Sequence, residues 1–150
     1  MTHRLPRIAL LATGGTIAGL ADDASDLTGY RAAQLGIADL LARMPALDGL
    51  AALVPEDIAA IDSKDATPAF WQAVGQRVQA AVDDPDIDAV VLTHGTDTLE
   101  ETAWYLQLTL RTRKPVVLTG AMRPGSAGLP DGPQDLADRG IGCRYRAGTA

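Results

Sequence analysis

The stretch that decides the fold is residues 8–16, with the sequence IALLATGGT. The five apolar residues 8–12 are followed directly by a turn of threonine and glycine residues. Three further apolar runs have the same form, and they lie at residues 58–61, 89–92 and 116–118. Continuous apolar runs bounded by turn residues are typical of strands that are buried on both faces of a parallel sheet. We therefore predict a parallel strand at each run.

Helical patterns fill the spaces between these runs. Thr67 followed by Pro68 predicts a helix start, because it places a cap residue before a proline at the first helical position. The apolar residues that follow recur at helical spacing and are Phe70, Val74, Val78 and Val82. Thr98 and Glu101 predict a capping box at the head of a second helix over residues 99–110, and a third helix is predicted over residues 37–43. Strands that alternate with helices indicate an α/β fold with a doubly wound parallel sheet.

Composition narrows the classes of function. The 150 residues suit one domain, and a net charge of -6 argues against nucleic-acid binding. Cys143 is the single cysteine, so it forms no intrachain disulfide. His3 and His94 lack partners at metal-ligand spacing, so we expect no metal site. The first apolar run is too short for a signal peptide, and no segment reaches the ~20 apolar residues of a membrane span. We expect a soluble, cytoplasmic protein.

Hydroxyl groups and glycines follow the predicted strands. The loop at residues 93–97 reads THGTD, the loop at residues 119–123 reads TGAMR, and the loop at residues 62–65 reads DSKD. In a parallel sheet these loops meet at one edge, where open α/β folds bind ligands. A single glycine turn carries no function by itself, but several at one edge let backbone N–H groups approach a ligand closely. The pattern favours a small polar substrate.

Two threonines in these loops are candidate nucleophiles, Thr16 and Thr96. A hydroxyl attacks only when a neighbouring base or charge activates it, and the alternative is that these residues are turn residues or helix caps. Asp97 could hold a substrate amine or position a base, and it could also cap the following helix. We expect His94 to shape its loop rather than to act as a general base.

Residues 8–19, 93–103 and 114–124 resemble the active-site motifs of the bacterial-type L-asparaginases, a family that includes glutaminase-asparaginases. The likeness runs from about Arg7 to Asp138. It implies the N-terminal domain of the asparaginase fold, with a flavodoxin-like sheet. It also implies a cofactor-free hydrolase that converts L-asparagine to aspartate and ammonia through a threonine nucleophile, and homo-oligomers for full-length members.

The resemblance implies a role for each matching residue. Thr16 falls on the primary nucleophile, and Tyr30 falls on the tyrosine that assists it. Thr96 falls on the second threonine, Asp97 on the acid that binds the α-amine, and Ser63 on a residue that holds the α-carboxylate. The remaining substrate-binding positions are Gly15, Gly95 and Ala121, the last through its backbone.

Two departures from the family bear on activity. Lys64 stands where many members have glutamine or a small polar residue, and it is a conceivable substitute base. The resemblance also implies that the family's chain continues past residue 138 and supplies a catalytic lysine and a second domain. Residues 139–150 lack helical periodicity, and we hypothesise a frameshift or a premature stop there. We therefore expect an incomplete N-terminal domain over residues 1–138, with very low turnover.

Three alternatives stay open. The chain could be a non-catalytic module that binds aspartate or asparagine. It could have glutaminase-asparaginase specificity. It could also be the amide-hydrolysing subunit of a tRNA-dependent amidotransferase, which shares these motifs.

Overall fold

The computed structural model describes residues 4–20, 31, 33–42, 49–124, 126, 131–132 and 135–137. Tyr30 and its loop lie outside the described residues, and so do His3, Cys143 and the segment 139–150. What was predicted for them stays a prediction. The account below concerns the described part of the chain.

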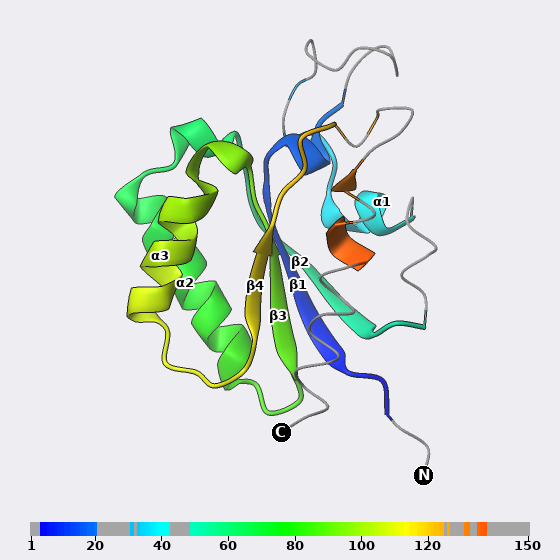
Figure 1. Ribbon diagram of the computed structural model, residues 1–150, viewed down its shortest axis with the longest axis vertical. Helices are drawn as coiled ribbons and strands as arrows, with labels where there is room; N and C mark the ends of the chain where they lie inside the picture. Colours follow the sequence, from blue (N-terminus) through cyan, green and yellow to red (C-terminus); the bar gives the residue numbers. More distant parts are fainter. Residues whose placement is uncertain are drawn as a thin grey trace.

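The sheet contains four strands, and all of its pairings are parallel (Figure 1). They are β1 (Arg7–Gly14), β2 (Ala52–Ile61), β3 (Ala89–Thr93) and β4 (Val116–Thr119), in the spatial order β2-β1-β3-β4. The α/β parallel fold is confirmed, and this order is the one in which a flavodoxin-like sheet begins. Because β2 lies on one side of β1 and β3 on the other, the chain reverses its direction of winding between β1 and β3. Ligands bind at such a point in open α/β sheets.

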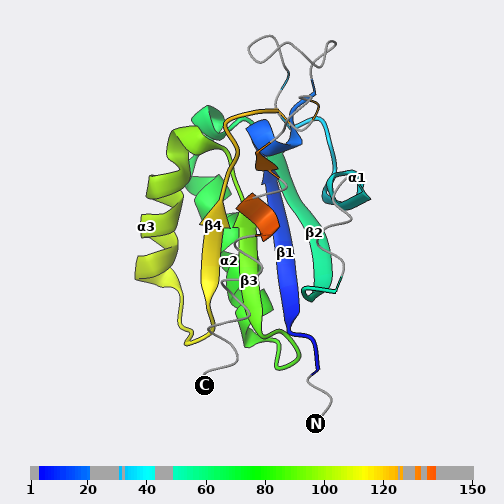
Figure 2. The same ribbon diagram turned by 45° about the vertical axis from the view of Figure 1, so that its right-hand side comes forward.

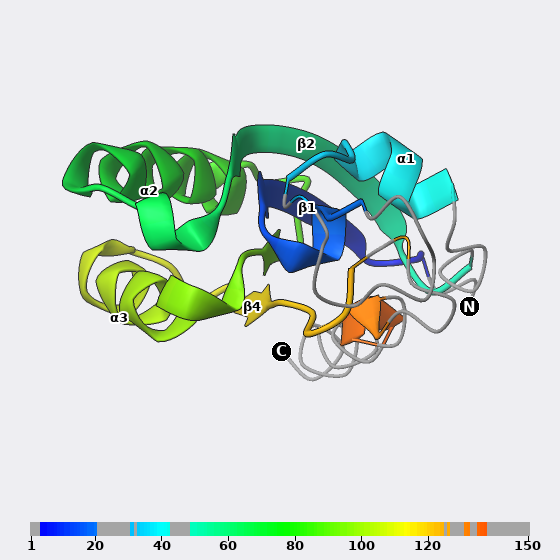
Figure 3. The same ribbon diagram turned by 90° about the horizontal axis from the view of Figure 1, so that it is seen from above.

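Helices pack on both faces of the sheet, which explains why the central strands are apolar without interruption. Seen from above, α2 (Pro68–Asp83) and α3 (Leu99–Thr109) cover one face, and α1 (Ile37–Ala42) lies on the other (Figure 3). Alternate residues of each strand point to opposite faces. Leu11 and Leu92 pack with the α2–α3 side, whereas Leu10 and Val91 pack with the α1 side.

The two long helices begin in different ways. Thr67 caps α2 as predicted, because its hydroxyl accepts a hydrogen bond of 3.3 Å from the Phe70 N–H. The capping box predicted for α3 is wrong. Thr98 makes no side-chain cap, because its hydroxyl donates instead to the carbonyl of Ser63 at 3.0 Å, and Glu101 is exposed. The hydroxyl that the sequence pattern assigned to a helix end connects two loops.

Strand β2 is longer than predicted, since it starts at Ala52 rather than at residue 58. Its first half contains Pro55, Glu56 and Asp57, which break the apolar pattern. None of its residues is buried, in contrast to β3, where every residue is buried. Among the described strands β2 lies at one end of the order, and an edge strand tolerates a proline because it need not donate to a second neighbour.

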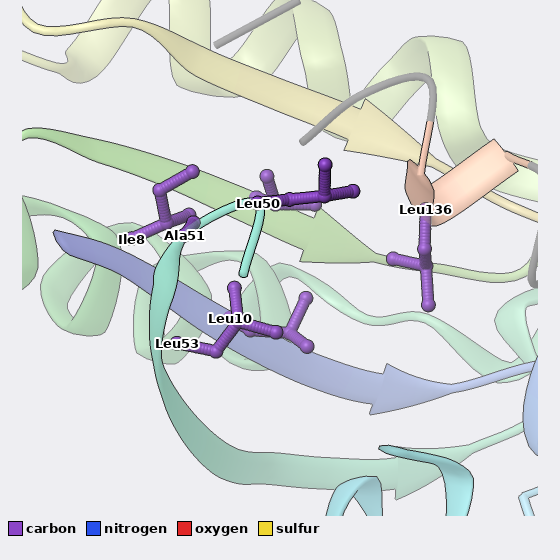
Figure 4. A pocket seen from close by; sticks show the side chains of 7 residues that line it. Ile8, Leu10, Leu50, Ala51, Leu53 and Leu136 are labelled. Carbon is purple, nitrogen blue, oxygen red and sulfur yellow. The ribbon is translucent and has the colours of Figure 1, made fainter. Parts of the chain in front are cut away.

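A small apolar cavity of about 20 Å³ lies on the α1 side of the sheet (Figure 4). The side chains of Ile8, Leu10, Leu53 and Leu136 line it, together with those of other apolar residues. A space of this size without polar partners suits neither a substrate nor an ordered water molecule. It is a packing gap in the core. In the described parts of the chain, no helix combines the length and the hydropathy needed to cross a membrane.

Candidate active site

Three strands end in loops of the same construction, and these loops meet at one end of the sheet (Figure 2). Each loop contains a short 3-10 turn that begins with a hydroxyl residue. The turns are η1 (Thr16–Ala18) after β1, η3 (Ser63–Asp65) after β2 and η4 (Thr96–Thr98) after β3. Because β1 and β3 flank the point where the winding reverses, Thr16 and Thr96 stand on its two sides.

The three loops line one cavity of about 240 Å³. This volume suits a ligand of the size of a small amino acid better than a cofactor. The residues that line it are Gly15, Thr16, Asp62, Ser63, Gly95, Thr96, Asp97 and Met122. Of the described residues to which the resemblance assigns a catalytic or substrate-binding role, all except Ala121 therefore line the same cavity.

The loops touch each other through their backbones. Gly15 has a φ of 78°, a conformation that side chains disfavour, and a Cβ atom there would lie 2.5 Å from the Cα of Gly95. A Cβ atom on Gly95 would in turn overlap the Oγ of Ser63. No methyl group fits at either contact. The two glycines thus allow the three loops to pack directly against one another at the cavity.

Ser63 is held by the neighbouring loop in an orientation that suits a hydrogen-bond donor. Its Oγ accepts a hydrogen bond of 3.2 Å from the Asp97 N–H, and its carbonyl accepts the hydroxyl of Thr98 at 3.0 Å. The side chain is 2% exposed. Since Oγ already accepts from a backbone donor, its own hydrogen can donate to a ligand in the cavity. A carboxylate oxygen is a suitable acceptor for that hydrogen.

The charge of the cavity wall is set by two carboxylates and one ammonium. Asp62 and Asp97 line the cavity, and the Lys64 Nζ lies 2.7 Å from Asp62 Oδ2. The hydrogen bond from Lys64 lowers the pKa of Asp62. The same hydrogen bond raises the pKa of Lys64, aided by the charges of Asp62, Asp65 and Asp97. Lys64 is therefore a charged ion-pair partner at neutral pH. This state does not suit the role of substitute base.

His94 is buried behind the cavity and bonded through both ring nitrogens. Its Nδ1 lies 2.7 Å from the Thr13 hydroxyl, and its Nε2 lies 2.9 Å from the Thr102 hydroxyl. The imidazole stacks on Phe70 of α2, with ring centroids 5.7 Å apart and an interplanar angle of 16°. Trp71 extends the chain of hydrogen bonds by donating its Nε1–H to Thr102 at 2.9 Å. The ring is thus fixed between both long helices and β1.

The hydrogens available in this chain determine the tautomer of His94. Thr13 donates its one hydroxyl hydrogen to the carbonyl of Thr93 at 2.9 Å, so it must accept from His94 Nδ1–H. The Nε2 atom is then an acceptor, and Thr102 supplies the hydrogen. Burial lowers the pKa of His94 below its ordinary value of 6.5. A neutral imidazole with both nitrogens engaged holds the loop in place, as the sequence indicated.

Two lining residues were not among the sequence candidates. Asp62 immediately precedes Ser63 at the end of β2, and its position after an apolar run was a usable signal. Met122 is 74% exposed, and no sequence pattern pointed to it. Ala121 is buried in the α1-side core rather than in the cavity wall, and its proposed backbone contact stays a prediction. Within the described ranges, no three His, Cys, Asp or Glu side chains gather in a way that could hold a metal ion.

Comparison with known proteins connects this site to a family. A family model described as "Asparaginase, N-terminal" matches residues 7–139. The glutaminase-asparaginase of Pseudomonas fluorescens biotype A is 42% identical over 133 residues, which cover 89% of this chain and 37% of that protein. A probable periplasmic L-asparaginase of Haemophilus influenzae is 43% identical over 132 residues, which cover 88% of this chain and 37% of that protein.

A solved structure agrees with these relatives. The crystal structure of a probable cytoplasmic L-asparaginase from Campylobacter jejuni has a TM-score of 0.88 and 42% sequence identity to this chain. The match covers 95% of this chain and 43% of that one. The chain therefore spans 37% of the length of the two curated relatives and less than half of the solved one.

Proposed function

The chain belongs to the asparaginase family, and on this premise we propose that it carries the threonine loops of an amidohydrolase that converts L-asparagine and water to L-aspartate and ammonia. The observation that carries the proposal is the convergence of Thr16, Ser63, Thr96 and Asp97 on one cavity. Hydroxyl groups and a carboxylate at a small polar cavity suit an α-amino acid with a side-chain amide.

In the proposed reaction, the Thr16 hydroxyl attacks the carbonyl carbon of the substrate's side-chain amide. The tetrahedral intermediate expels ammonia, whose nitrogen takes up the proton that the hydroxyl loses, and an ester between Thr16 and the acyl group remains. Water then attacks the ester, which releases aspartate and restores the hydroxyl. Fixed donors around the cavity stabilise the oxyanion that forms in each step.

The substrate's other groups match the remaining wall. The carboxylate of Asp97 is exposed at the cavity and suits the positively charged α-amine. The hydroxyl of Ser63 is oriented to donate and suits the α-carboxylate. Thr96 is the proposed second threonine, and Tyr30 is the proposed assistant of Thr16. Amine and carboxylate therefore have separate partners on two neighbouring loops, which the hydrogen bond from the Asp97 N–H to Ser63 Oγ joins.

The described residues also support the proposal that this chain turns over slowly. A hydroxyl nucleophile needs a base, and neither nitrogen base near the loops suits the role. Lys64 is paired with Asp62, and His94 is buried with both of its nitrogens engaged. Ligand binding without rapid hydrolysis is the second candidate function, and this observation favours it for the 150-residue chain.

A cytoplasmic location, a homo-oligomeric state and a preference for asparagine over glutamine belong to the same proposal. One relative is named a glutaminase-asparaginase, one is named cytoplasmic and one periplasmic, so the relatives differ on two of these points. Cell fractionation of the source organism tests the location. A comparison of ammonia release from equal concentrations of the two amides tests the preference.

Calorimetry and an ammonia assay together test the function. We expect the chain to bind L-aspartate, and Asp97→Asn to weaken binding by about tenfold or more, since a charged hydrogen bond is lost. Thr16→Val should keep binding and abolish the residual ammonia release from L-asparagine. Asp65→Asn is the matched control, because it makes the same charge change in the neighbouring turn η3 at a residue that does not line the cavity.

Two results would overturn the proposal. Undiminished ammonia release in Thr16→Val excludes that hydroxyl as the nucleophile. Absence of both aspartate binding and ammonia release in a chain that still melts cooperatively excludes the cavity as an amino-acid site.

A further inference from the structure

Met122 is the part of the cavity wall that the loop after β4 contributes. Among the described lining residues it alone comes from that loop, since the others belong to the loops after β1, β2 and β3. Its side chain is 74% exposed, so packing against neighbouring side chains restrains it little. The place of Met122 in the wall is therefore set by its backbone.

Asp131 fixes that backbone through two hydrogen bonds. Its Oδ2 accepts from the Met122 N–H at 2.9 Å, and its Oδ1 accepts from the Arg123 N–H at 3.0 Å. Two successive N–H groups that point at one carboxylate hold it well, because both dipoles face the same negative charge. The two bonds belong to the peptide groups on either side of the Met122 Cα atom. Because peptide groups are planar, the carboxylate restrains both backbone dihedrals of Met122.

Asp131 is itself anchored in the core. Its carbonyl accepts a hydrogen bond of 3.1 Å from the Asp135 N–H, which closes a helical turn. Leu136, the next residue, is 4% exposed, and its side chain lines the apolar cavity with Ile8 and Leu10 (Figure 4). The carboxylate therefore belongs to a segment that core packing holds in place.

Gly132 connects the same segment to the turn that contains Thr16. A Cβ atom on Gly132 would lie 2.7 Å from Ile17 Cγ1 and 3.7 Å from the Cβ of Ala121, so no side chain fits there. Ile17 directly follows Thr16 in η1 and is 1% exposed. The segment thus lies against both the turn of the proposed nucleophile and the loop after β4.

We propose that Asp131 is a positioning residue for the amino-acid ligand, because its carboxylate keeps Met122 in the wall of the cavity. Asp131 is not among the described lining residues, so it acts on the ligand through Met122. The inference rests on the proposed function, since it concerns the same cavity. Without the carboxylate the loop is open part of the time, and the apparent affinity falls with the fraction of closed molecules. A residue that only stabilised the fold would leave the affinity of the folded chain unchanged.

Amide hydrogen exchange followed by NMR tests the restraint in the unsubstituted chain. Met122 and Arg123 are exposed, yet the two bonds should slow exchange of their N–H groups at least about tenfold relative to an unstructured peptide. L-aspartate at about ten times its dissociation constant should slow both a further tenfold or so, if the ligand binds only the closed loop. These measurements need no variant. Exchange at the unstructured rate, or exchange that bound aspartate does not slow, would overturn the inference.

Asp131→Asn tests the carboxylate itself, because it keeps the shape of the side chain and leaves one acceptor oxygen. It should speed exchange of both N–H groups by about tenfold, since a charged hydrogen bond is lost. In calorimetry it should raise the dissociation constant of L-aspartate about threefold to tenfold. Charge alone predicts the opposite sign, because the ligand has a net negative charge and the variant removes one from the protein. Asp86→Asn is the matched control, with the same charge change in an exposed turn before β3.

A double-mutant cycle shows whether Asp131 acts through Met122. Met122→Ala should raise the dissociation constant about threefold or more, because the ligand loses contacts with the wall. If the carboxylate only holds Met122 in place, the two losses do not add. The double variant should then bind within about twofold of the weaker single variant. Urea melts show whether each variant remains folded.

The outcomes separate this inference from the proposed function. Losses that multiply in the double variant show that Asp131 acts independently of Met122. An affinity that Asp131→Asn leaves unchanged assigns Asp131 a purely structural role, while aspartate binding by the unsubstituted chain still supports the proposed function. Absence of aspartate binding in the folded, unsubstituted chain overturns both.

Discussion

Replacing Thr102 with valine removes one hydroxyl group from the centre of the hydrogen-bond chain around His94 and keeps the shape of the side chain. Thr102 is 0% exposed, and its hydroxyl has two partners. It accepts from Trp71 Nε1–H at 2.9 Å and donates to His94 Nε2 at 2.9 Å. After the substitution, the indole N–H and the imidazole Nε2 both lose their bond. The Thr98 hydroxyl lies 3.2 Å from Nε2, but its hydrogen already goes to the carbonyl of Ser63.

The magnitude follows from the number of polar atoms that are left without a partner. A buried donor or acceptor without a partner costs about 1–3 kcal/mol. Nε2 is fully enclosed and should stand in the upper part of that range, whereas the part-buried indole N–H can reach water at a lower cost. The valine offsets about 1 kcal/mol, because a hydroxyl no longer needs to be buried. The net loss expected for Thr102→Val is about 2–3 kcal/mol.

Urea unfolding followed by circular dichroism measures this loss. With a slope of about 2 kcal/mol per molar urea, the midpoint should fall by roughly 1–1.5 M. Thr109→Val is the matched control, because it removes a hydroxyl from the same helix that is exposed and donates to the Tyr105 carbonyl. We expect it to change the free energy of unfolding by less than about 0.5 kcal/mol. Thr102→Ser keeps the hydroxyl and should lose only the contribution of one methyl group, about 1 kcal/mol.

Equal midpoints for Thr102→Val and Thr109→Val would refute the reasoning, because they would mean that no buried partner depends on the Thr102 hydroxyl. A Thr102→Ser variant as unstable as Thr102→Val would refute it as well. In that case the methyl group, rather than the hydrogen bonds, would carry the stability.

Further predictions concern pH, loop contact and charge. Burial lowers the pKa of His94, so the unfolded chain binds a proton below about pH 6.5 that the folded chain refuses. The stability that His94 contributes should be complete above that pH and be lost as the pH falls towards its lowered pKa, by at most about 1.4 kcal/mol per pH unit, and urea midpoints of His94→Asn should show a shallower decline. Gly95→Ala should abolish aspartate binding in calorimetry, because the added Cβ overlaps the Oγ of Ser63, and unchanged affinity would show that the loops can separate without harm. Lys64→Met should weaken aspartate binding roughly threefold to tenfold at low salt, because it leaves Asp62 as an unpaired anion at the cavity, and an effect that persists in 1 M salt would contradict an electrostatic origin.

The sequence was a good guide wherever burial on two sides forces a simple pattern. β1 and β3 are central strands, and their unbroken apolar runs follow directly from the helices that pack on both faces. The first half of β2 was not predicted, because a half-buried edge strand needs neither a continuous apolar run nor a strict alternation of apolar and polar residues. Pro55 and Glu56 are poor strand residues by propensity, and only the pairing with β1 makes them part of a strand.

The location of the site could also be predicted from the sequence, since the loops that follow parallel strands lie at one edge of the sheet. The sequence alone therefore predicts Thr16, Ser63 and Thr96 at one edge of the sheet, where all three line the cavity. The chain through His94 could not, because Thr13 is 81 residues and Thr102 eight residues away from it in sequence. The direction of each hydrogen bond in this chain depends on which other partner takes the hydroxyl hydrogen. Thr98 gives a similar example, because the sequence pattern predicts a helix cap, whereas its hydroxyl donates to the Ser63 carbonyl of another loop.

The contact between Gly15 and Gly95 has a consequence for engineering the pocket. Because these loops meet main chain to main chain, neither glycine can serve as a position for diversifying substrate preference. A library that randomises whole motifs would spend most of its members on chains whose loops no longer close. Productive variation is confined to side chains at the edge of this framework, foremost Met122 and Asp62, which line the cavity, and Lys64, which pairs with Asp62. Redesign of this site for another small amide should therefore start from those three positions and leave the threonine-glycine framework untouched.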